Sequence, residues 1–313
     1  MIFPIEINRS YQRSQEDVKL ASIIIAVRND KRLRNLLESL SHQTLPRKKY
    51  QILVIENGSH IFKDLAKEYQ AEYYHLKYAN TPAARNLGLS HSTGKYALFT
   101  DADCVVSVDW ISNLVNFLEA NTQLVGCGGP IRSHNPKSPV QKYGSNLVWG
   151  QSQLSYILTI TPFPYIVTAN AAFHLEKVRD IGGFDCRLLS GNDVDLCYRL
   201  ASCGNKINIC PNAVVFHNNR STVSAHFRRY FRYATYQALI YKKHNHNNRQ
   251  RIRINPYPYK CLKESLSNML RASYSSFKGD NGPLWCCFLL SVEGIGTLAG
   301  GIYGAFKFHV AYF

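Results

Sequence analysis

Short apolar runs alternate with segments of helical spacing over the first 120 residues, and this alternation constrains the fold more than any other feature. The runs at 20–27, 51–55 and 96–99 are almost continuously apolar. Such runs are typical of strands that are buried on both faces of a parallel sheet. Between the first two runs, leucines at 33, 36, 37 and 40 recur at the spacing of an amphipathic helix. The pattern therefore predicts a doubly wound α/β domain.

Two carboxylates follow the third apolar run. Asp101 and Asp103 are separated by one small residue and stand where the strand at 96–99 should end. Carboxylate oxygens suit Mg²⁺ or Mn²⁺, and a cation with few protein ligands can also bind phosphate oxygens. Open α/β sheets bind their ligands at the carboxyl ends of strands. Position and chemistry together predict a metal–diphosphate site, whereas the simpler alternative is an acidic turn.

The charge of the chain is strongly positive and uneven. Lys and Arg number 37 against 21 Asp and Glu, and no acidic residue occurs between Asp195 and Glu264, a stretch with thirteen Lys and Arg. Such a one-sided field attracts nucleotide phosphates, nucleic acid or an acidic membrane surface, and the alternative is a solvated face needed for solubility. The nine scattered cysteines and the absence of a signal peptide motif predict reduced thiols in a cytoplasmic protein.

The regular alternation fades after residue 130. We expect loops and short elements over 131–165, a stretch of the kind that forms a binding face, and ordered structure again over 166–217. A helix is predicted from Ser224, followed by an exposed linker at 245–259. The sequence therefore predicts an α/β domain at 1–222 and a basic, helical appendage with an apolar tail at 223–313.

The tail at 283–313 is apolar and rich in glycine. Glu293 interrupts the apolar run, and glycines weaken a helix in water. We expect helices that lie on or dip into a membrane, with the basic stretch before them holding anionic lipid. The alternative is a tail packed on the catalytic domain or on another subunit.

Six motifs, in order, make the chain resemble a family 2 glycosyltransferase of the GT-A fold. They cover about two thirds of the chain, and their order is more specific than any one of them. The motifs are SIIIAVRN at 22–29, VIENGS at 54–59, PAARNLG at 82–88, TDAD at 100–103, IGGFD at 181–185 and GNDVDL at 191–196. The resemblance implies a doubly wound mixed sheet flanked by helices, with the basic helical segment appended at the C-terminus.

The resemblance also implies roles for individual residues. Asp103 would bind Mn²⁺ or Mg²⁺ directly, Asp101 would hold the ribose or a metal-bound water, and His217 would complete the metal shell. Glu56 and Arg85 would bind the nucleotide of a nucleotide-sugar donor, expected to be a UDP-sugar. From the residues alone, Glu56 is equally a turn residue before Asn57-Gly58, Arg85 a surface ion-pair partner and His217 a structural histidine.

Asp193 is the candidate general base in this resemblance. Transfer of a sugar to a hydroxyl requires removal of the hydroxyl proton, which a carboxylate can accept. The family usually has Glu-Asp where this chain has Asn192-Asp193, and loss of the neighbouring negative charge would tend to lower the pKa of the base. Asp195 is the alternative base, or a residue that stabilises the start of a helix.

The resulting interpretation is an inverting, metal-assisted glycosyltransferase, hexosyltransferase-like, of the kind that serves polysaccharide biosynthesis. The acceptor would be a glycan or a lipid-linked glycan at the cytoplasmic face of a membrane. The segment 227–233 lacks the Gln-x-x-Arg-Trp motif of processive synthases. This absence favours addition of a single sugar. A sugar nucleotidyltransferase is disfavoured because no glycine follows the first strand. A non-catalytic protein that binds anions or nucleic acid on a degenerate GT-A fold is the other alternative, although no nucleic-acid motif is present.

Overall fold

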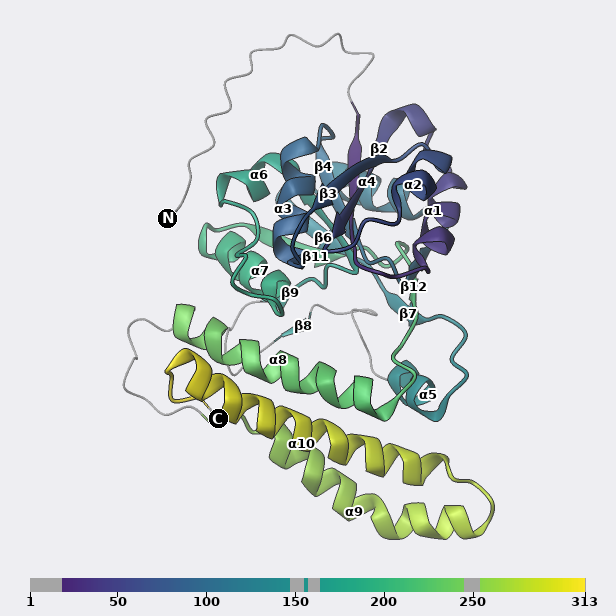
Figure 1. Ribbon diagram of the computed structural model, residues 1–313, viewed down its shortest axis with the longest axis vertical. Coiled ribbons are helices and arrows are strands. Elements are labelled where there is room, and N and C mark those ends of the chain that lie inside the picture. The colour runs from purple at the N-terminus through teal and green to yellow at the C-terminus, as the bar shows by residue number, and fades with distance from the viewer. Residues whose placement is uncertain (1–18, 147–154, 157–163, 245–253, 313) are drawn as a thin grey trace.

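The computed structural model describes residues 19–146, 155–156, 164–244 and 254–312, which form a mixed α/β domain followed by long helices (Figure 1). The domain is built on a seven-stranded sheet. In spatial order its strands are β11 (Lys206–Ile209), β6 (Leu124–Gly128), β10 (Asn170–His174), β4 (Tyr96–Thr100), β1 (Ala21–Val27), β2 (Tyr50–Asn57) and β3 (Glu72–Leu76). Strand β10 runs antiparallel to both of its neighbours and the other pairs are parallel, which confirms the predicted mixed sheet.

The three apolar runs of the sequence form the centre of this sheet. Strand β1 pairs with β2 and β4 in parallel, with Ile24 opposite both Leu53 and Phe99. Every residue of β2 and β4 is buried. Because both faces of these strands are covered, each strand is apolar along almost its whole length rather than at alternate positions.

Helices cover both faces of the sheet. The core on one face includes side chains from α1 (Leu33–Ser41), α2 (Lys63–Glu68) and α4 (Trp110–Ala120). The core on the other face includes side chains from α3 (Thr81–His91), α6 (Leu175–Asp180) and α7 (Asn192–Ser202). A short 3-10 helix, η2 (Arg47–Lys49), precedes β2. The two-sided packing is the doubly wound arrangement that the alternating pattern predicts.

A second, three-stranded sheet places part of the site. It consists of β5 (Cys104–Val106), β12 (Val215–His217) and β7 (Ile131–Ser133). Strand β12 lies between the other two, so that His217 is opposite Cys104 on one side and Ser133 on the other. The pairing brings a residue from late in the chain next to the carboxyl end of β4.

The irregular stretch at 131–165 holds short elements, as expected. Besides β7 it contains α5 (Pro139–Asn146) and the two-residue strands β8 (Ser155–Tyr156) and β9 (Pro164–Tyr165), which pair with each other. The parts of this stretch at 147–154 and 157–163 lie outside the described residues.

The C-terminal segment consists of α8 (Val223–His244), α9 (Tyr257–Phe277) and α10 (Gly282–Phe308). Figure 1 shows α8 between the catalytic domain and α10, with α9 folded back against α10. Helix α8 begins within one residue of the predicted Ser224. The predicted linker at 245–259 is partly wrong, because Tyr257 to Tyr259 already belong to α9. Residues 245–253 lie outside the described part of the chain.

Helix α10 is continuous through the glycines and through Glu293, so this residue interrupts the apolar run of the sequence without ending the helix. Gly296, Gly300 and Gly304 face α8 so closely that a Cβ on Gly300 or Gly304 would collide with α8 backbone. Glu293 is fully buried, accepts a hydrogen bond from Tyr257 Oη at 2.8 Å, and lies 3.1 Å from His226 Nε2. Close packing against α8 therefore offsets the helix cost of the glycines, about 1 kcal/mol each.

Gly300→Ala tests this packing. The new methyl group would meet the carbonyl of Phe231, which is backbone and cannot move aside as a side chain can. We expect a loss of about 1 to 3 kcal/mol in the free energy of unfolding, despite the better helix propensity of alanine. Thermal unfolding measures the change. Gly282→Ala is the matched control, since a Cβ there meets the side chain of Asp280 alone. Equal effects of the two substitutions would contradict the close approach of α10 to α8.

Candidate functional site

The two aspartates at the end of β4 differ in their exposure. The side chain of Asp103 is 10% exposed and that of Asp101 is 37% exposed. The backbone turns immediately after Asp101, whose carbonyl accepts a hydrogen bond from Cys104 N at 3.0 Å. Asn218 fixes the backbone of Asp103 by donating from N at 3.0 Å and from Nδ2 at 2.9 Å to its carbonyl. One carboxylate is thus held inside the fold and the other lies at the surface of the cavity.

His217 lies next to Asp103, where the resemblance predicts a metal ligand. Its Nε2 is 3.5 Å from Asp103 Oδ2, and its Nδ1 is 3.2 Å from Asn219 Oδ1. A carboxylate oxygen and an imidazole nitrogen at this separation fit two adjacent ligands of Mn²⁺. No group of three or more His, Cys, Asp and Glu side chains converges within the described ranges. The donor set therefore fits a divalent cation that takes its remaining ligands from water or from a bound diphosphate.

Two guanidinium groups and one imidazole surround the carboxylate of Asp103. Besides His217, Arg32 Nη2 lies 3.5 Å and Arg220 Nη1 lies 3.9 Å from Oδ2. Burial raises the pKa of Asp103, and the charges of His217, Arg32 and Arg220 reduce that shift without cancelling it. All three distances exceed those of a strong charge-assisted hydrogen bond. The carboxylate is therefore buried among cations without being saturated by them.

Arg85 links the aspartate pair after β4 to the first turn of α7. It lies on α3, whose start is fixed by Asn80 through a hydrogen bond from Ala83 N at 2.9 Å. The guanidinium is buried and donates to Asp101 Oδ1 at 3.0 Å and to Asn192 Oδ1 at 2.8 Å. The structure thus places Arg85 in the cavity rather than in a surface ion pair, and its fork orients the exposed aspartate.

Asp193 faces the same cavity from the first turn of α7. Gly191 precedes this helix with a φ of 69°, and a Cβ there would collide with Ile240 of α8. The carboxylate of Asp193 accepts a hydrogen bond from Val194 N at 3.0 Å. Burial raises its pKa more than the charge of Arg85 lowers it. Our expectation of a lowered pKa, based on Asn192 in place of an acid, omitted this burial and is corrected by it.

Asp195 occupies a different position from Asp193. It is fully buried, does not line the cavity, and is 2.9 Å from Arg199 Nε, 2.6 Å from Lys243 Nζ and 2.8 Å from His244 Nε2. Burial would raise the pKa of Asp195, but His244, Arg199 and Lys243 together hold it below its usual value. This aspartate links α7 to α8, and its contacts favour a structural role over that of the base.

Glu56 accepts hydrogen bonds from the backbone of the loop that follows β2. Its buried carboxylate accepts hydrogen bonds from Ile61 N at 2.9 Å, Phe62 N at 2.9 Å and Tyr73 Oη at 2.9 Å. Burial would raise the pKa of Glu56, and these hydrogen bonds together lower it. Glu56 lines neither of the cavities described below. The contacts match the alternative of a residue that holds the turn, and a contact with the nucleobase stays a prediction.

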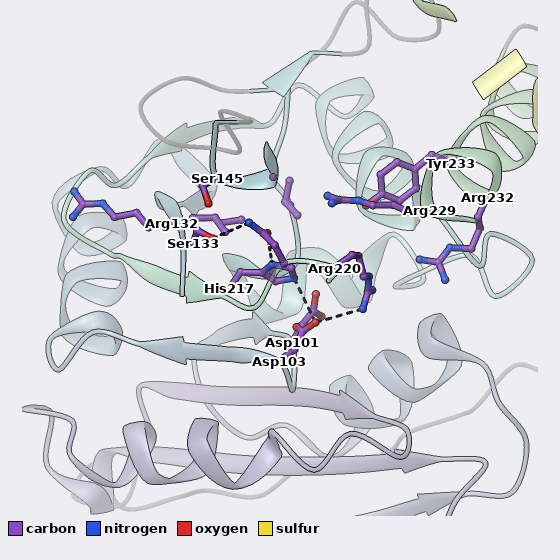
Figure 2. Close-up of a pocket in the computed structure, with 15 residues that line it drawn as sticks. Asp101, Asp103, Arg132, Ser133, Ser145, His217, Arg220, Arg229, Arg232 and Tyr233 are labelled. Atoms are coloured by element: carbon purple, nitrogen blue, oxygen red, sulfur yellow. Dashed lines mark hydrogen bonds and ion pairs between the residues drawn. The ribbon is translucent and has the colours of Figure 1, made fainter. Parts of the chain in front are cut away.

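Two adjoining cavities meet at the aspartate pair. The larger, about 570 Å³, extends from the end of β1 past Arg85 to Asp193. The smaller, about 140 Å³, lies between the aspartates and α8, and Figure 2 shows Arg220, Arg229, Arg232 and Tyr233 around it. The residues that line both cavities are Asp101, Asp103, Val167, Arg220, Arg232 and Tyr233.

The basic helix with Arg229 and Arg232 was a candidate for binding the diphosphate or the membrane, whereas Arg132 was not predicted from the sequence. Arg132 on β7, Arg220 after β12, and Arg229 and Arg232 on α8 all line the smaller cavity. The available signal was the long stretch without acidic residues, which contains three of the four. Four guanidiniums against two carboxylates give this cavity the charge that suits a phosphorylated ligand.

Comparison with known proteins identifies the family. The model of "Glycosyl transferase family 2" matches residues 22–182, half of the chain. A pre-mycofactocin glycosyltransferase of Mycobacterium tuberculosis is 29% identical over 209 residues, which are 64% of this chain and 43% of that protein. Glycosyltransferase AglE of Haloferax volcanii is 27% identical over 210 residues, 64% of this chain and 67% of that protein. The chain thus spans less than half the length of the mycobacterial relative.

Solved structures share the fold at low sequence identity. The mannosyltransferase PcManGT from Pyrobaculum calidifontis, in complex with GDP-Man and Mn²⁺, superposes with a TM-score of 0.61 at 16% identity, covering 93% of this chain and 88% of that one. GalNAc-T7 with UDP, GalNAc and Mn²⁺ gives a TM-score of 0.53 at 19% identity, covering 66% and 44% of the two chains. With this fold and the match of half its length to the family model, the chain belongs to glycosyl transferase family 2 and contains the catalytic domain of a glycosyltransferase.

Proposed function

We propose that this protein transfers one sugar from a nucleotide-diphosphate sugar to a hydroxyl group of a glycan or lipid-linked glycan, with metal assistance and with inversion at the anomeric carbon. The observation that supports this most is the shared cavity, which joins Asp101, Asp103 and Arg85 to Asp193. A site for a leaving diphosphate and a site for a base thus lie on one surface, as direct displacement requires. The inversion is implied by the family resemblance.

Asp103 and His217 would hold Mn²⁺ or Mg²⁺, with Asp101 beside them. When bound, the cation would neutralise charge that develops on the departing diphosphate. Arg85 keeps Asp101 oriented through the hydrogen bond at 3.0 Å. Arg220 and Arg232 line both cavities. Their guanidinium groups would donate paired N–H hydrogen bonds to the phosphate oxygens.

Asp193 would accept the proton of the acceptor hydroxyl while the hydroxyl oxygen forms its bond to the anomeric carbon. The bond from that carbon to the donor phosphate breaks in the same displacement, and the nucleoside diphosphate leaves with the electron pair. A carboxylate with a raised pKa is a stronger base than an ordinary aspartate, which suits this step. The acceptor would reach Asp193 through the larger cavity, to which the irregular stretch at 131–165 contributes Tyr165.

We propose a UDP-sugar as the donor and the cytoplasm as the compartment. One of the two structural neighbours is in complex with GDP-Man and the other with UDP, so they support a nucleotide-sugar donor without indicating one base. The nine cysteines are free thiols, as is usual in a reducing compartment.

A thermal-shift panel of nucleoside diphosphates, with and without Mn²⁺, tests the donor site. A ligand that binds the folded state alone must raise the unfolding temperature. We expect UDP to do so in the presence of Mn²⁺, and the shift to vanish in Asp103→Ala. Asp64→Ala removes an exposed carboxylate of α2 and should leave the shift unchanged. Stabilisation by another base would change the donor assignment, and no shift with any nucleotide would contradict the site.

Paired substitutions separate the base from the scaffold. Asp193→Asn should lower kcat by about 10² to 10⁴-fold and leave donor binding intact. Because burial raises the pKa of Asp193, its charged form disfavours the folded state above the carboxyl's unfolded pKa, so Asp193→Asn should also raise Tm at neutral pH. Asp195→Asn should instead lower Tm, since it breaks a buried ion-pair network.

Steady-state kinetics and thermal unfolding of Asp193→Asn and Asp195→Asn distinguish the proposed base from the structural aspartate. Retained turnover in Asp193→Asn would contradict the base assignment. The wild-type pH profile gives a further check, because kcat/KM should fall with decreasing pH through an apparent pKa above that of an ordinary aspartate.

Two arginines of α8 test the diphosphate site. Arg232 lines both cavities, whereas Arg228 lies on the same helix outside them and donates to Ser224 Oγ at 2.9 Å. Arg232→Gln should weaken binding of the nucleoside diphosphate about tenfold and binding of the nucleoside monophosphate much less. Arg228→Gln, of equal charge change, should alter neither affinity. Calorimetric titration measures both, and an equal loss in the two variants would point to a general field effect instead.

A further inference from the structure

Helix α10 exposes an apolar stripe along its whole length. The outer stripe consists of Trp285, Phe288, Val292, Ile295, Ala299, Ile302 and Phe306, which recur at steps of three and four residues and so share one side of the helix. Phe306 is 73% exposed, Ile295 is 53% exposed and Phe288 is 49% exposed. No charged residue interrupts the stripe. A soluble helix normally presents the reverse pattern, with polar residues outward.

The other sides of α10 are already occupied. Gly296, Gly300 and Gly304 face α8, and Gly294 faces Pro258 and Cys261 of α9. These glycine contacts fix the rotation of the helix and direct the outer stripe away from both neighbours. Among the described residues, none of the exposed members of the stripe is covered by the remainder of the chain.

Exposed residues of α9 and of the turn after it indicate the chemistry of the partner that the outer stripe binds. Helix α9 adds Leu266, Leu270 and Tyr274 to the exposed apolar side chains, with Leu270 85% exposed. Arg271 and Lys278 lie close to them in the sequence, and Lys278 Nζ lies over the ring of Tyr274 at 4.6 Å from its centroid. Exposed apolar and aromatic side chains with a cation such as Lys278 in contact with one of them suit a partner that is apolar below an anionic surface.

The packing of α10 favours a position in the plane of such a surface. Among the described helices, α10 is the one whose length and hydropathy would allow it to span a membrane, and 44% of its most apolar window is buried. However, Glu293 on its inner side is fully buried, 3.1 Å from His226 of α8. A spanning orientation of α10 would separate Glu293 from His226 and place a carboxyl group in hydrocarbon. Lying alongside α8 keeps the pair intact.

We propose that the outer stripe of α10, with the exposed side chains of α9, docks on an anionic lipid bilayer with the helix axis parallel to the surface. The apolar side chains enter the boundary between headgroups and acyl chains, and the cations of α9 contact the headgroups. Binding holds α8 one helix layer from the lipid, because packed helices lie about 8 to 10 Å apart. The proposal does not depend on the identity of the donor or acceptor.

Flotation of the full chain with lipid vesicles tests this docking. We expect binding to phosphatidylcholine vesicles that contain about one third phosphatidylglycerol, and much weaker binding to phosphatidylcholine alone, with salt reducing the difference. The triple variant Ile295→Ser/Ile302→Ser/Phe306→Ser should bind the anionic vesicles at least about tenfold more weakly. Its Tm and its affinity for a nucleoside diphosphate should match the wild type, since two of the three side chains are more than half exposed and Ile302 is 40% exposed.

A double variant of the catalytic domain supplies the control. Val108 and Tyr78 are 52% and 59% exposed and lie far from α10 in the sequence, so Tyr78→Ser/Val108→Ser should bind vesicles as the wild type does. Trp285 supplies a direct reporter, because it is 39% exposed while Trp110 is fully buried. Trp149 lies outside the described residues, so the test uses Trp149→Phe as its background. Brominated lipid should quench the tryptophan fluorescence of Trp149→Phe, and most of that quenching should be lost in Trp149→Phe/Trp285→Phe.

Three results would overturn the proposal. One is wild-type binding by the triple variant, and another is equal binding of the wild type to neutral and anionic vesicles. The third is a lipid-free dimer, detected by light scattering, that the triple variant dissociates. That result would assign the stripe to a second copy of the chain instead of lipid.

Discussion

The site depends on the burial of β1, β2 and β4 on both faces of the central sheet. Almost all side chains along these strands are buried, so the strands admit few polar groups except near their ends. The acidic residues that follow β4, and the one near the end of β2, therefore lie along one edge of the sheet. Asp101, Asp103 and Glu56 are all placed in this way. The position of the chemistry follows from the same hydrophobic constraint that forms the core.

The buried aspartates show how similar sequence contexts lead to different chemistry. Asp195 has cationic partners at 2.6 to 2.9 Å, and they outweigh its burial and lower its pKa. The cations around Asp103 lie at 3.5 to 3.9 Å, and burial prevails, so its pKa is raised. A buried carboxylate whose charge is incompletely balanced gains more from an added cation than one that is already saturated. This difference supports Asp103, and not Asp195, as a ligand-binding group.

The sequence was informative wherever local pattern determines structure. Apolar runs and leucine spacing predicted the central strands and α1, and the position of the Asp pair followed from the end of a strand. The contacts of Glu56, the raised pKa of Asp193 and the approach of Arg232 to the cavity depend on tertiary packing, which no local pattern encodes. The continuity of α10 through its glycines also depends on tertiary packing. Helix propensity counts each glycine as a cost, but Gly300 permits a backbone approach to α8 that a single sequence does not disclose.

Helix α8 couples the catalytic domain to the rest of the appendage. On one side it contributes Arg232 to the cavity, and its last turn binds Asp195 of α7 through Lys243 and His244. Its other side is packed against the glycines of α10. The first turn of α7 holds Asp193, so the position of the proposed base depends on α8, and that of α8 on α10. A surface that binds α10 would therefore set the orientation of the cavity through one intervening helix. An acceptor anchored in the same surface would then reach Asp193 from a fixed direction, which lowers the entropic cost of bringing its hydroxyl to the donor.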